Sequence, residues 1–251
     1  MNVKHNNKKN MTIKNTSLTN YDKALSWEIF DKIYQRYDTI NTILSAGILR
    51  SWRKILVTEF PLTDKLVALD CATGTGEVMV SVMNSHHTSI ASYTGIDLSK
   101  NMMDLGEKRL KDKVYASKIT FKHASATEIP YESKSFNCVS MAFGIRNIVD
   151  YQACLREIYR VLTKDGTVLI MEFSLPNNML IRWLYLMYFR FVLPLIGGLL
   201  SGDKKAYSYL NKTVESFPYG KAFKKELETV GFNVTMKPLT FGIATLYIGK
   251  K

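Results

Sequence analysis

The stretch from Val67 to Glu77, which reads V-A-L-D-C-A-T-G-T-G-E, constrains the fold of this chain more than any other. A short apolar run ends in Asp70, and a loop with glycines at positions 74 and 76 follows at once. The run is typical of a buried strand, because it is short and bounded by turn residues. Residues 78–83 have a helical pattern. The loop therefore joins a strand to a helix, which is where nucleotide-like ligands bind in doubly wound α/β sheets.

A second acidic strand end strengthens this interpretation. The loop alone is not specific, since it is neither G-x-G-x-x-G nor a P-loop, and an ordinary strand-to-helix turn would explain it equally well. Residues 93–98 read Y-T-G-I-D-L, so Asp97 ends another expected strand. It follows the glycines by about 20 residues, where an acid can reach the hydroxyl pair of a ribose. Ser99 is a suitable N-cap for the next helix.

The rest of the chain alternates between strand and helix patterns, which predicts βαβ units and a mostly parallel sheet with helices on both faces. Two helices are expected within residues 21–58, and a helix over 219–230 is expected to end at Gly231. A turn is expected at Asp165-Gly166, before the fifth strand. The expected strands are residues 66–69, 93–96, 119–122, 136–141, 167–172, 233–237 and 243–249, the last two as a hairpin-like pair.

Composition indicates the class of protein but does not identify its binding partner. The 251 residues fit one α/β domain, and the formal net charge of +12 favours nucleic acid, an acidic membrane or an acidic substrate. Residues 1–20 form a basic tail that we expect to be disordered, without the apolar core of a secretory signal. The three cysteines have no metal-ligand spacing, so we expect no metal site and a reducing compartment.

One segment, Met179 to Leu200, is apolar and long enough to cross a membrane. Arg182 and Arg190 lie inside it, and a charge at the centre of a bilayer is costly. Pro194 and a glycine pair are expected to break its second half. We therefore expect an aromatic lid helix and a turn, within an insertion over 177–218. The helix either walls an apolar pocket or contacts a membrane surface, or it simply packs on the domain.

Three further stretches carry a resemblance to a known family. They are R-Y-D-T-I-N (Arg36 to Asn41), A-F-G-I-R-N (Ala142 to Asn147) and the run from Leu155 to Pro176. With the glycine loop and Asp97, their order resembles the class I S-adenosylmethionine (SAM) methyltransferases and, more narrowly, the UbiE/MenG quinone C-methyltransferases. The resemblance covers residues 21–249. It implies a Rossmann-like fold with seven strands, the last antiparallel, with residues 21–62 covering the site of a domain over 63–251.

The resemblance also implies SAM as methyl donor and a demethylated quinol with a polyprenyl tail as acceptor. Family contacts carry over to Thr75 in the loop, to Asp97 at the ribose and to Ser125-Ala126 at the adenine. Ala142 stands where the family usually has Ser, so a contact there must come from the backbone. We expect Asp70 to fix the loop or bind the cofactor's amino group. The expected cofactor residues are Asp70, Gly74, Thr75, Gly76, Asp97, Ser125, Ala126 and Ala142.

Methylation of a quinol ring carbon requires a ring hydroxyl to lose its proton and the resulting charge to be stabilised. Arg146 is a poor base, so we expect it to act as an electrostatic clamp on the phenolate, with Asn147 orienting the same oxygen. A part for Arg146 in proton removal stays open, as does a structural ion pair with a helix acid. Tyr37 and Asp38 are expected to fold over the site, Asp38 as an alternative base. Glu172 is a weaker candidate.

The sequence therefore predicts a cytoplasmic C-methyltransferase that converts demethylmenaquinol to menaquinol and works at the inner face of the membrane. Ubiquinone-pathway methylation and methylation of another lipid are the enzymatic alternatives, and a SAM-fold scaffold or membrane-binding subunit without catalysis is a third. Nucleic acid is not an expected partner, because F-G-I-R-N stands where amine methyltransferases carry N/D-P-P-Y/F. Peripheral membrane contact and a homodimer are both compatible with the sequence.

Overall fold

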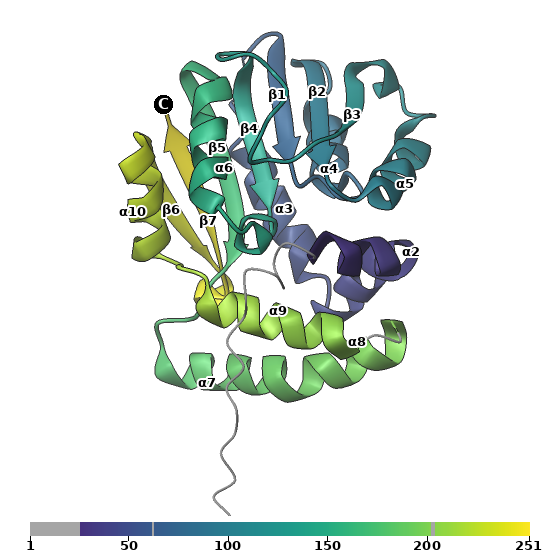
Figure 1. Ribbon diagram of the computed structural model, residues 1–251, viewed down its shortest axis with the longest axis vertical. Coiled ribbons are helices and arrows are strands. Elements are labelled where there is room, and N and C mark those ends of the chain that lie inside the picture. The colour runs from purple at the N-terminus through teal and green to yellow at the C-terminus, as the bar shows by residue number, and fades with distance from the viewer. Residues whose placement is uncertain (1–25, 62, 202–203) are drawn as a thin grey trace, which may run out of the picture.

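The computed structural model describes residues 26–61, 63–201 and 204–251. The expected basic tail lies outside these residues. One twisted sheet occupies the upper part of the molecule, and a layer of helices lies below the ends of its strands (Figure 1). This arrangement places the candidate site between the two parts.

The sheet has seven strands in the order β3-β2-β1-β4-β5-β7-β6. Only β7 runs antiparallel to its neighbours β5 and β6. The prediction of a mostly parallel, Rossmann-like sheet with an antiparallel last strand is thus confirmed. The strands are β1 (Leu66–Cys71), β2 (Ile90–Asp97), β3 (Ile119–His123), β4 (Phe136–Ala142), β5 (Leu162–Phe173), β6 (Asn233–Leu239) and β7 (Ala244–Lys250).

Helices cover both faces of the sheet, as the alternating pattern predicted. One apolar core joins the sheet to α6 and α10, and a second joins it to α3 and α4. The helices are α2 (Ser26–Leu44), α3 (Ile48–Thr58), α4 (Glu77–His86), α5 (Lys100–Leu110), α6 (Tyr151–Val161), α7 (Met179–Met187), α8 (Leu193–Ser201), α9 (Lys204–Ser216) and α10 (Lys221–Val230). Short helical turns are η1 (Ala116–Lys118), η2 (Ile145–Asn147), η3 (Tyr188–Val192) and η4 (Thr240–Gly242).

Local sequence sets where these elements begin and end. The Ser99 hydroxyl accepts the Met102 backbone N–H at 3.3 Å, which makes Ser99 the N-cap of α5 as predicted. Gly231 ends α10 with φ +117°, a left-handed conformation that glycine adopts without strain. The expected turn at Asp165-Gly166 occurs inside β5, where Asp165 has φ +65° and the pairing with β4 shifts register. It is an irregularity within the strand rather than a separate turn before it.

The expected break after the lid helix was wrong. α7, η3 and α8 follow one another without a gap from Met179 to Ser201. Pro194 lies in the first turn of α8, directly after the π-helical η3. Because the hydrogen-bond ladder is already irregular at a π turn, the missing proline N–H does not end the helix.

The lower layer consists of α2 and of α7 to α9 (Figure 1). A third apolar cluster joins it to the end of β5. Its buried members are Ile40, Leu175, Tyr185, Phe189, Leu193 and Val214. The segment from α7 to α9 fills the predicted insertion and lies across the carboxyl ends of the strands, where ligands bind in parallel sheets.

Candidate functional site

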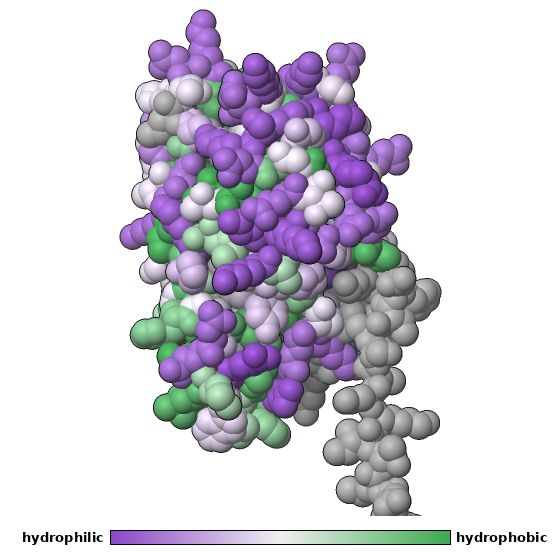
Figure 2. All heavy atoms as spheres, turned by 90° about the vertical axis from the view of Figure 1, so that its left-hand side faces the viewer, coloured by the Kyte–Doolittle hydropathy of each residue, from purple (hydrophilic) through white to green (hydrophobic). Residues whose placement is uncertain are grey.

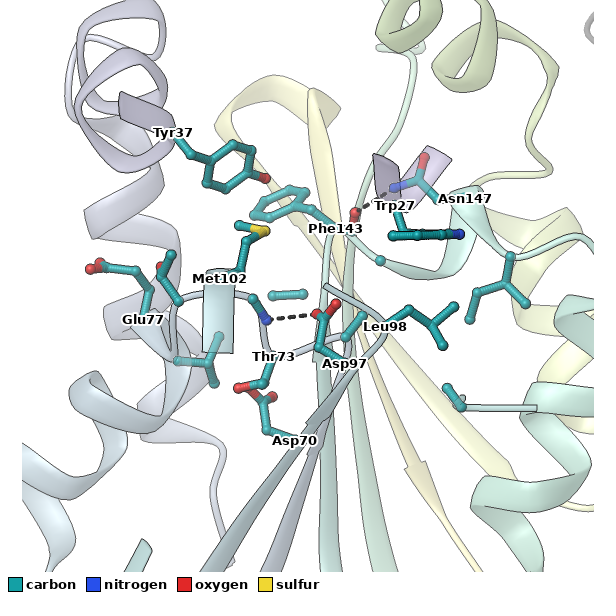
Figure 3. A pocket seen from close by; sticks show the side chains of 18 of the residues that line it. Trp27, Tyr37, Asp70, Thr73, Glu77, Asp97, Leu98, Met102, Phe143 and Asn147 are labelled. Carbon is teal, nitrogen blue, oxygen red and sulfur yellow. Dashed lines mark hydrogen bonds between the residues drawn. The ribbon is translucent and has the colours of Figure 1, made fainter. Parts of the chain in front are cut away.

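A cavity of about 600 Å³ opens between the carboxyl ends of β1, β2 and β4 and the helix α2 (Figure 3). Its volume lies within the range of pockets that hold a cofactor together with part of a substrate. Twelve of the residues that line it bear on the binding of a cofactor or an acceptor. They are Trp27, Tyr37, Asp38, Asp70, Gly74, Thr75, Asp97, Ser125, Ala126, Ala142, Phe143 and Asn147.

Two carboxylates at the ends of neighbouring strands hold the glycine loop. The Thr73 hydroxyl donates to Asp70 at 2.7 Å, and the Gly74 backbone N–H donates to Asp97 at 2.8 Å. Gly74 and Gly76 have φ values of +56° and +75°, so both positions favour glycine. The loop is thereby fixed with its backbone facing the cavity, as a ligand-binding loop requires.

Asp97 is placed to bind a pair of hydroxyl groups. Its carboxylate accepts the Gly74 N–H and the Ser99 N–H, each at 2.8 Å, and each oxygen keeps a further lone pair. Burial raises the pKa of Asp97, while the hydrogen bonds from Ser99 and Gly74 oppose that rise. The side chain lines the cavity beside Leu98 (Figure 3). This geometry fits the ribose of an adenosyl group.

Asp70 of β1 holds the glycine loop from the side of the sheet. It is buried and accepts the Thr73 hydroxyl and, at 2.5 Å, the Ser140 hydroxyl. Burial raises the pKa of Asp70 to about 7, although the bonds from Ser140 and Thr73 lower it. Of the two roles expected for Asp70, these contacts favour the one in holding the loop.

The expected adenine and methionine ends of the cavity also lie together. Ser125 and Ala126 follow β3, and the Ser125 hydroxyl is 2.8 Å from that of Thr127. Ala142 ends β4 and lines the cavity. Next to it, a Cβ on Gly144 would come within 2.6 Å of the Ala72 Cβ, so this crossing of two strand ends requires glycine. Seven of the eight predicted cofactor residues therefore line one cavity, and Gly76 is the exception.

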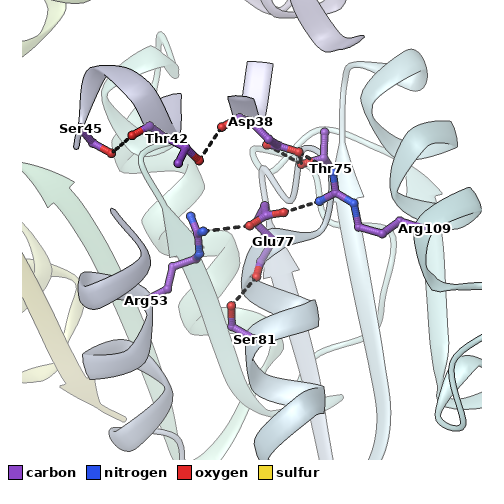
Figure 4. Close-up of polar contacts among 8 residues, drawn as sticks. All are labelled: Asp38, Thr42, Ser45, Arg53, Thr75, Glu77, Ser81 and Arg109. Atoms are coloured by element: carbon purple, nitrogen blue, oxygen red, sulfur yellow. Dashed lines mark hydrogen bonds and ion pairs between the residues drawn. The ribbon is translucent and has the colours of Figure 1, made fainter. Parts of the chain in front are cut away.

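An ionic clasp, formed by Asp38, Thr75, Glu77, Arg53 and Arg109, joins α2 to the glycine loop (Figure 4). Asp38 accepts the Thr75 hydroxyl at 3.0 Å and a bond from Arg109 at 2.6 Å. Glu77 pairs with Arg109 and, at 2.8 Å, with Arg53. Asp38 is thus engaged in closing α2 over the loop, and Thr75 points its hydroxyl toward α2.

The sequence reasoning missed the three charged partners in the clasp. Glu77 follows the glycine loop directly, and an acid in the first turn of a helix is a recognisable signal. Arg53 and Arg109 carry no such signal, because they approach from α3 and α5.

Arg146 lies behind the cavity wall. Its guanidinium donates to Glu172 on β5 at 2.7 Å and to the Phe143 carbonyl at 2.6 Å. The pair is almost fully buried, with 5% of the Arg146 side chain exposed and 1% of that of Glu172. Arg146 is therefore held by a strand acid, not by the helix acid considered from the sequence. Burial raises the pKa of Glu172, while the charge of Arg146 lowers it.

Unpartnered polar atoms gather around this pair. Within the described residues, Arg146 Nε, Asn147 Oδ1 and Tyr185 Oη are buried without a hydrogen-bond partner. Burial raises the pKa of Tyr37, which lines the cavity, and the positive charge of Arg146 lowers it. A buried polar atom without a partner is costly, so Asn147 Oδ1, whose residue lines the cavity, is suited to accept a hydrogen bond from a ligand.

Comparison with known proteins identifies relatives along almost the whole chain. A model of the ubiE/COQ5 methyltransferase family matches residues 18–251. The Geotalea daltonii protein named ubiquinone/menaquinone biosynthesis C-methyltransferase UbiE is 44% identical, over 89% of this chain and 95% of its own length. A demethylmenaquinone methyltransferase of Bacteroides fragilis is 36% identical, over 89% of this chain and 91% of its own.

Solved structures share the fold at low sequence identity. A SAM-dependent methyltransferase from Thermotoga maritima superposes with a TM-score of 0.63 at 17% identity, covering 90% of this chain and 99% of its own. A phosphoethanolamine N-methyltransferase from Haemonchus contortus, solved with SAM, has a TM-score of 0.54 at 19% identity and covers 75% of this chain and 38% of its own. These likenesses show the class I methyltransferase fold.

Proposed function

The chain belongs to the ubiE/COQ5 methyltransferase family and is a SAM-dependent methyltransferase, and we propose that it methylates a ring carbon of a demethylated polyprenyl quinol. One observation carries the proposal. The same cavity is lined by a loop and acid suited to an adenosyl cofactor and, at its other wall, by Tyr37, Asn147 and Phe143 in front of a buried Arg–Glu pair. The two sets of groups belong to the two reactants.

The acceptor end of the cavity suits an aromatic ring with a hydroxyl group. Phe143 packs on Phe173 at 4.6 Å between ring centroids, and Phe173 lies 6.0 Å from Phe189 of the lid segment. An aromatic row thus runs from the cavity wall into the lower helical layer. Aromatic rings bind one another in such offset and edge-on arrangements. The row therefore supports an acceptor that is both aromatic and attached to an apolar tail.

When bound, SAM supplies a methyl group on a positively charged sulfur. The quinol carbon next to an ionised hydroxyl attacks that methyl group, a C–C bond forms, and the S–CH₃ electrons stay on sulfur. The same carbon then loses its proton, which restores the aromatic ring. In this proposal Asn147 Oδ1 accepts from the ring hydroxyl and so orients that oxygen before it ionises, and Arg146 stabilises the resulting charge from behind the wall.

The remaining candidates take supporting roles. Asp38 is occupied by Thr75 and Arg109, so we assign it to closing α2 rather than to proton removal. Tyr37 lines the cavity from the same helix and contacts the ring. Water is the proton acceptor in this scheme, because the Glu172 carboxylate is engaged by Arg146 and by the Phe173 backbone N–H.

Demethylmenaquinol is the proposed acceptor, and the names of relatives such as that of Bacteroides fragilis support it. The demethylated benzoquinol of the ubiquinone pathway is the second candidate, supported by the names of the Geotalea relatives. Both acceptors carry a polyprenyl tail, so we place the enzyme in the cytoplasm, peripheral at the inner face of the membrane.

Methyl transfer tests the proposal directly. The protein is incubated with SAM carrying a CD₃ group and, in parallel, with reduced demethylmenaquinone or reduced demethylated benzoquinone, each with a short isoprenoid tail. Mass spectrometry is expected to find the label on the naphthoquinol ring. Label on neither ring, while calorimetry still detects SAM binding, would overturn the proposed acceptors. Loss of SAM binding as well would indicate a scaffold.

A further inference from the structure

The segment α7–η3–α8 presents a long apolar stripe to solvent. The exposed residues recur every three or four positions, so they lie along one side of the helix. They include Leu180, Trp183, Leu184, Met187, Phe191, Leu195 and Leu199, exposed by 41% to 77%. We call this stripe the outer face. In the most apolar 18-residue stretch between Met179 and Leu199 only 17% of the residues are buried, although the segment is apolar enough to cross a membrane.

The opposite side of the segment packs against the rest of the protein. Tyr185, Phe189 and Leu193 belong to the third apolar cluster, together with Ile40 of α2. Tyr188 donates its hydroxyl to the Leu44 carbonyl at 2.5 Å. Since one side packs on the domain, the segment lies along the lower edge of the molecule rather than standing free (Figure 1). Figure 2 shows apolar side chains at this lower end, below a largely hydrophilic upper surface.

We propose that the outer face docks on an anionic lipid surface, with the helix axis parallel to the membrane. Exposed apolar patches of this length mark interaction sites. Between residues 179 and 201 the charged residues of the sequence are Arg182 and Arg190, without an acid. Arg190 pairs with Glu215 of α9 at 2.7 Å, which leaves Arg182 and the chain's net charge of +12 to attract anionic headgroups. A helix with aliphatic and Trp side chains on one side and arginines at its flank is typical of binding in the headgroup region.

The charges favour lipid over a second copy of the chain as the occupant. Two such faces offer no acid to pair with Arg182, whereas anionic headgroups attract it. The segment is about 30 Å long at 1.5 Å per residue, so several side chains enter the membrane at once. The inference rests on the proposed function in one respect, because a docked lid lets a polyprenyl tail stay in the bilayer while the ring reaches the cavity.

Vesicle binding tests the docking face. The full chain is sedimented with sucrose-loaded vesicles of phosphatidylcholine, with and without phosphatidylglycerol. We expect binding to the anionic vesicles, tighter by about fivefold for each arginine that reaches the surface. Leu184→Ser and Phe191→Ser remove apolar area without adding charge, and the double variant is expected to bind at least tenfold more weakly. Val114→Ser is the matched control, because Val114 is 88% exposed in the turn after α5.

Three outcomes would overturn the proposal. Wild-type protein that fails to sediment with either vesicle would do so, as would equal binding by the double variant and the wild type. The third is a dimer, seen by light scattering without lipid, that the same two substitutions dissociate while vesicles are not bound. Methyl transfer to a short-tailed quinol without vesicles is measured separately. Activity without vesicle binding would contradict the docking proposal and leave the proposed function standing.

Discussion

Asp70 makes the stability of the ligand-free protein depend on pH. Its ordinary pKa is 3.8, and burial raises this pKa to about 7 in the folded chain. Between these values the folded protein holds a proton that the unfolded chain has released, so its free energy of unfolding falls as pH rises. The loss reaches about 4 kcal/mol above pH 7, by the relation between a pKa shift and stability.

We predict that Asp70→Asn flattens this dependence. Urea unfolding of wild type and variant from pH 5 to pH 8 measures the difference between their slopes. Asp97 and Glu172 also have raised pKa values, so the wild-type slope contains their contributions and only the difference reports on Asp70. Equal slopes for the two proteins would show that Asp70 is ionised in the folded state throughout this range.

The catalytic role that we propose for Arg146 can be separated from its structural role with a double variant. We expect Arg146→Ala to lower the free energy of unfolding by about 3 kcal/mol, because it leaves Glu172 buried without its partner. Adding Glu172→Gln removes that buried charge and is expected to restore part of the stability. Turnover is expected to stay about 100-fold low in both proteins, with SAM affinity kept.

Urea unfolding and single-turnover methylation measure the two effects on the same preparations. If turnover recovers together with stability in the double variant, Arg146 acts only by holding the strand end. If SAM binding is lost instead, the arginine supports the cofactor half of the cavity.

At the scale of elements, two aspartates attach α2 to the cofactor half of the domain. Asp31 accepts the Ser99 hydroxyl at 2.6 Å and the Asn101 side-chain N–H at 2.8 Å, at the start of α5. Asp38 forms the ionic clasp on the glycine loop. Both acids reach across from α2 to groups that form or support the cofactor site.

We predict that Asp38→Asn loosens α2 and weakens SAM binding by about tenfold, since the charge-assisted bond to Arg109 is lost. Hydrogen exchange of residues 26–44 and calorimetric titration with SAM measure the two effects. Asp104→Asn is the control, because Asp104 is exposed on the neighbouring α5. Faster exchange without any loss of SAM affinity would show that the attachment of α2 does not contribute to SAM binding.

The elements also show what sequence can and cannot predict here. The strand ends at Asp70 and Asp97 and the N-cap Ser99 are local signals, and the alternation of strand and helix patterns predicted the sheet. The contacts expected of Thr75, Ser125 and Ala142 came from the family resemblance. The clasp was not predicted, because Arg109 and Asp38 are 71 positions apart and neither residue type signals its partner. The lid was predicted with a break because Pro194 usually ends a helix, and a preceding π turn has no sequence signature.

For the whole molecule, the cysteines report on global unfolding. Cys71, Cys138 and Cys154 are all fully buried, and burial raises the pKa of each thiol. A thiol reacts through its thiolate. These cysteines are therefore protected twice, because a reagent cannot reach them and because they stay protonated. They lie in β1, β4 and α6, so a single opening of the domain is needed to expose all of them.

We predict that a thiol reagent such as Ellman's reagent modifies none of the three cysteines on mixing with the folded protein, and all three in denaturant. The slow reaction in buffer is expected to follow the global unfolding rate measured by circular dichroism. Rapid modification of one thiol in buffer would reveal local opening of the sheet around it.

The ionic clasp has a consequence for the order of events in catalysis. α2 supplies Trp27, Tyr37 and Asp38 to the wall of the cavity, and the clasp holds this helix over the loop that faces the adenosyl group. A spent cofactor buried under such a helix leaves only after Asp38 parts from Thr75 and Arg109. We therefore expect one opening of α2 for each exchange of cofactor. Because salt weakens the ion pairs of the clasp, the turnover rate is expected to rise with ionic strength wherever this opening limits it.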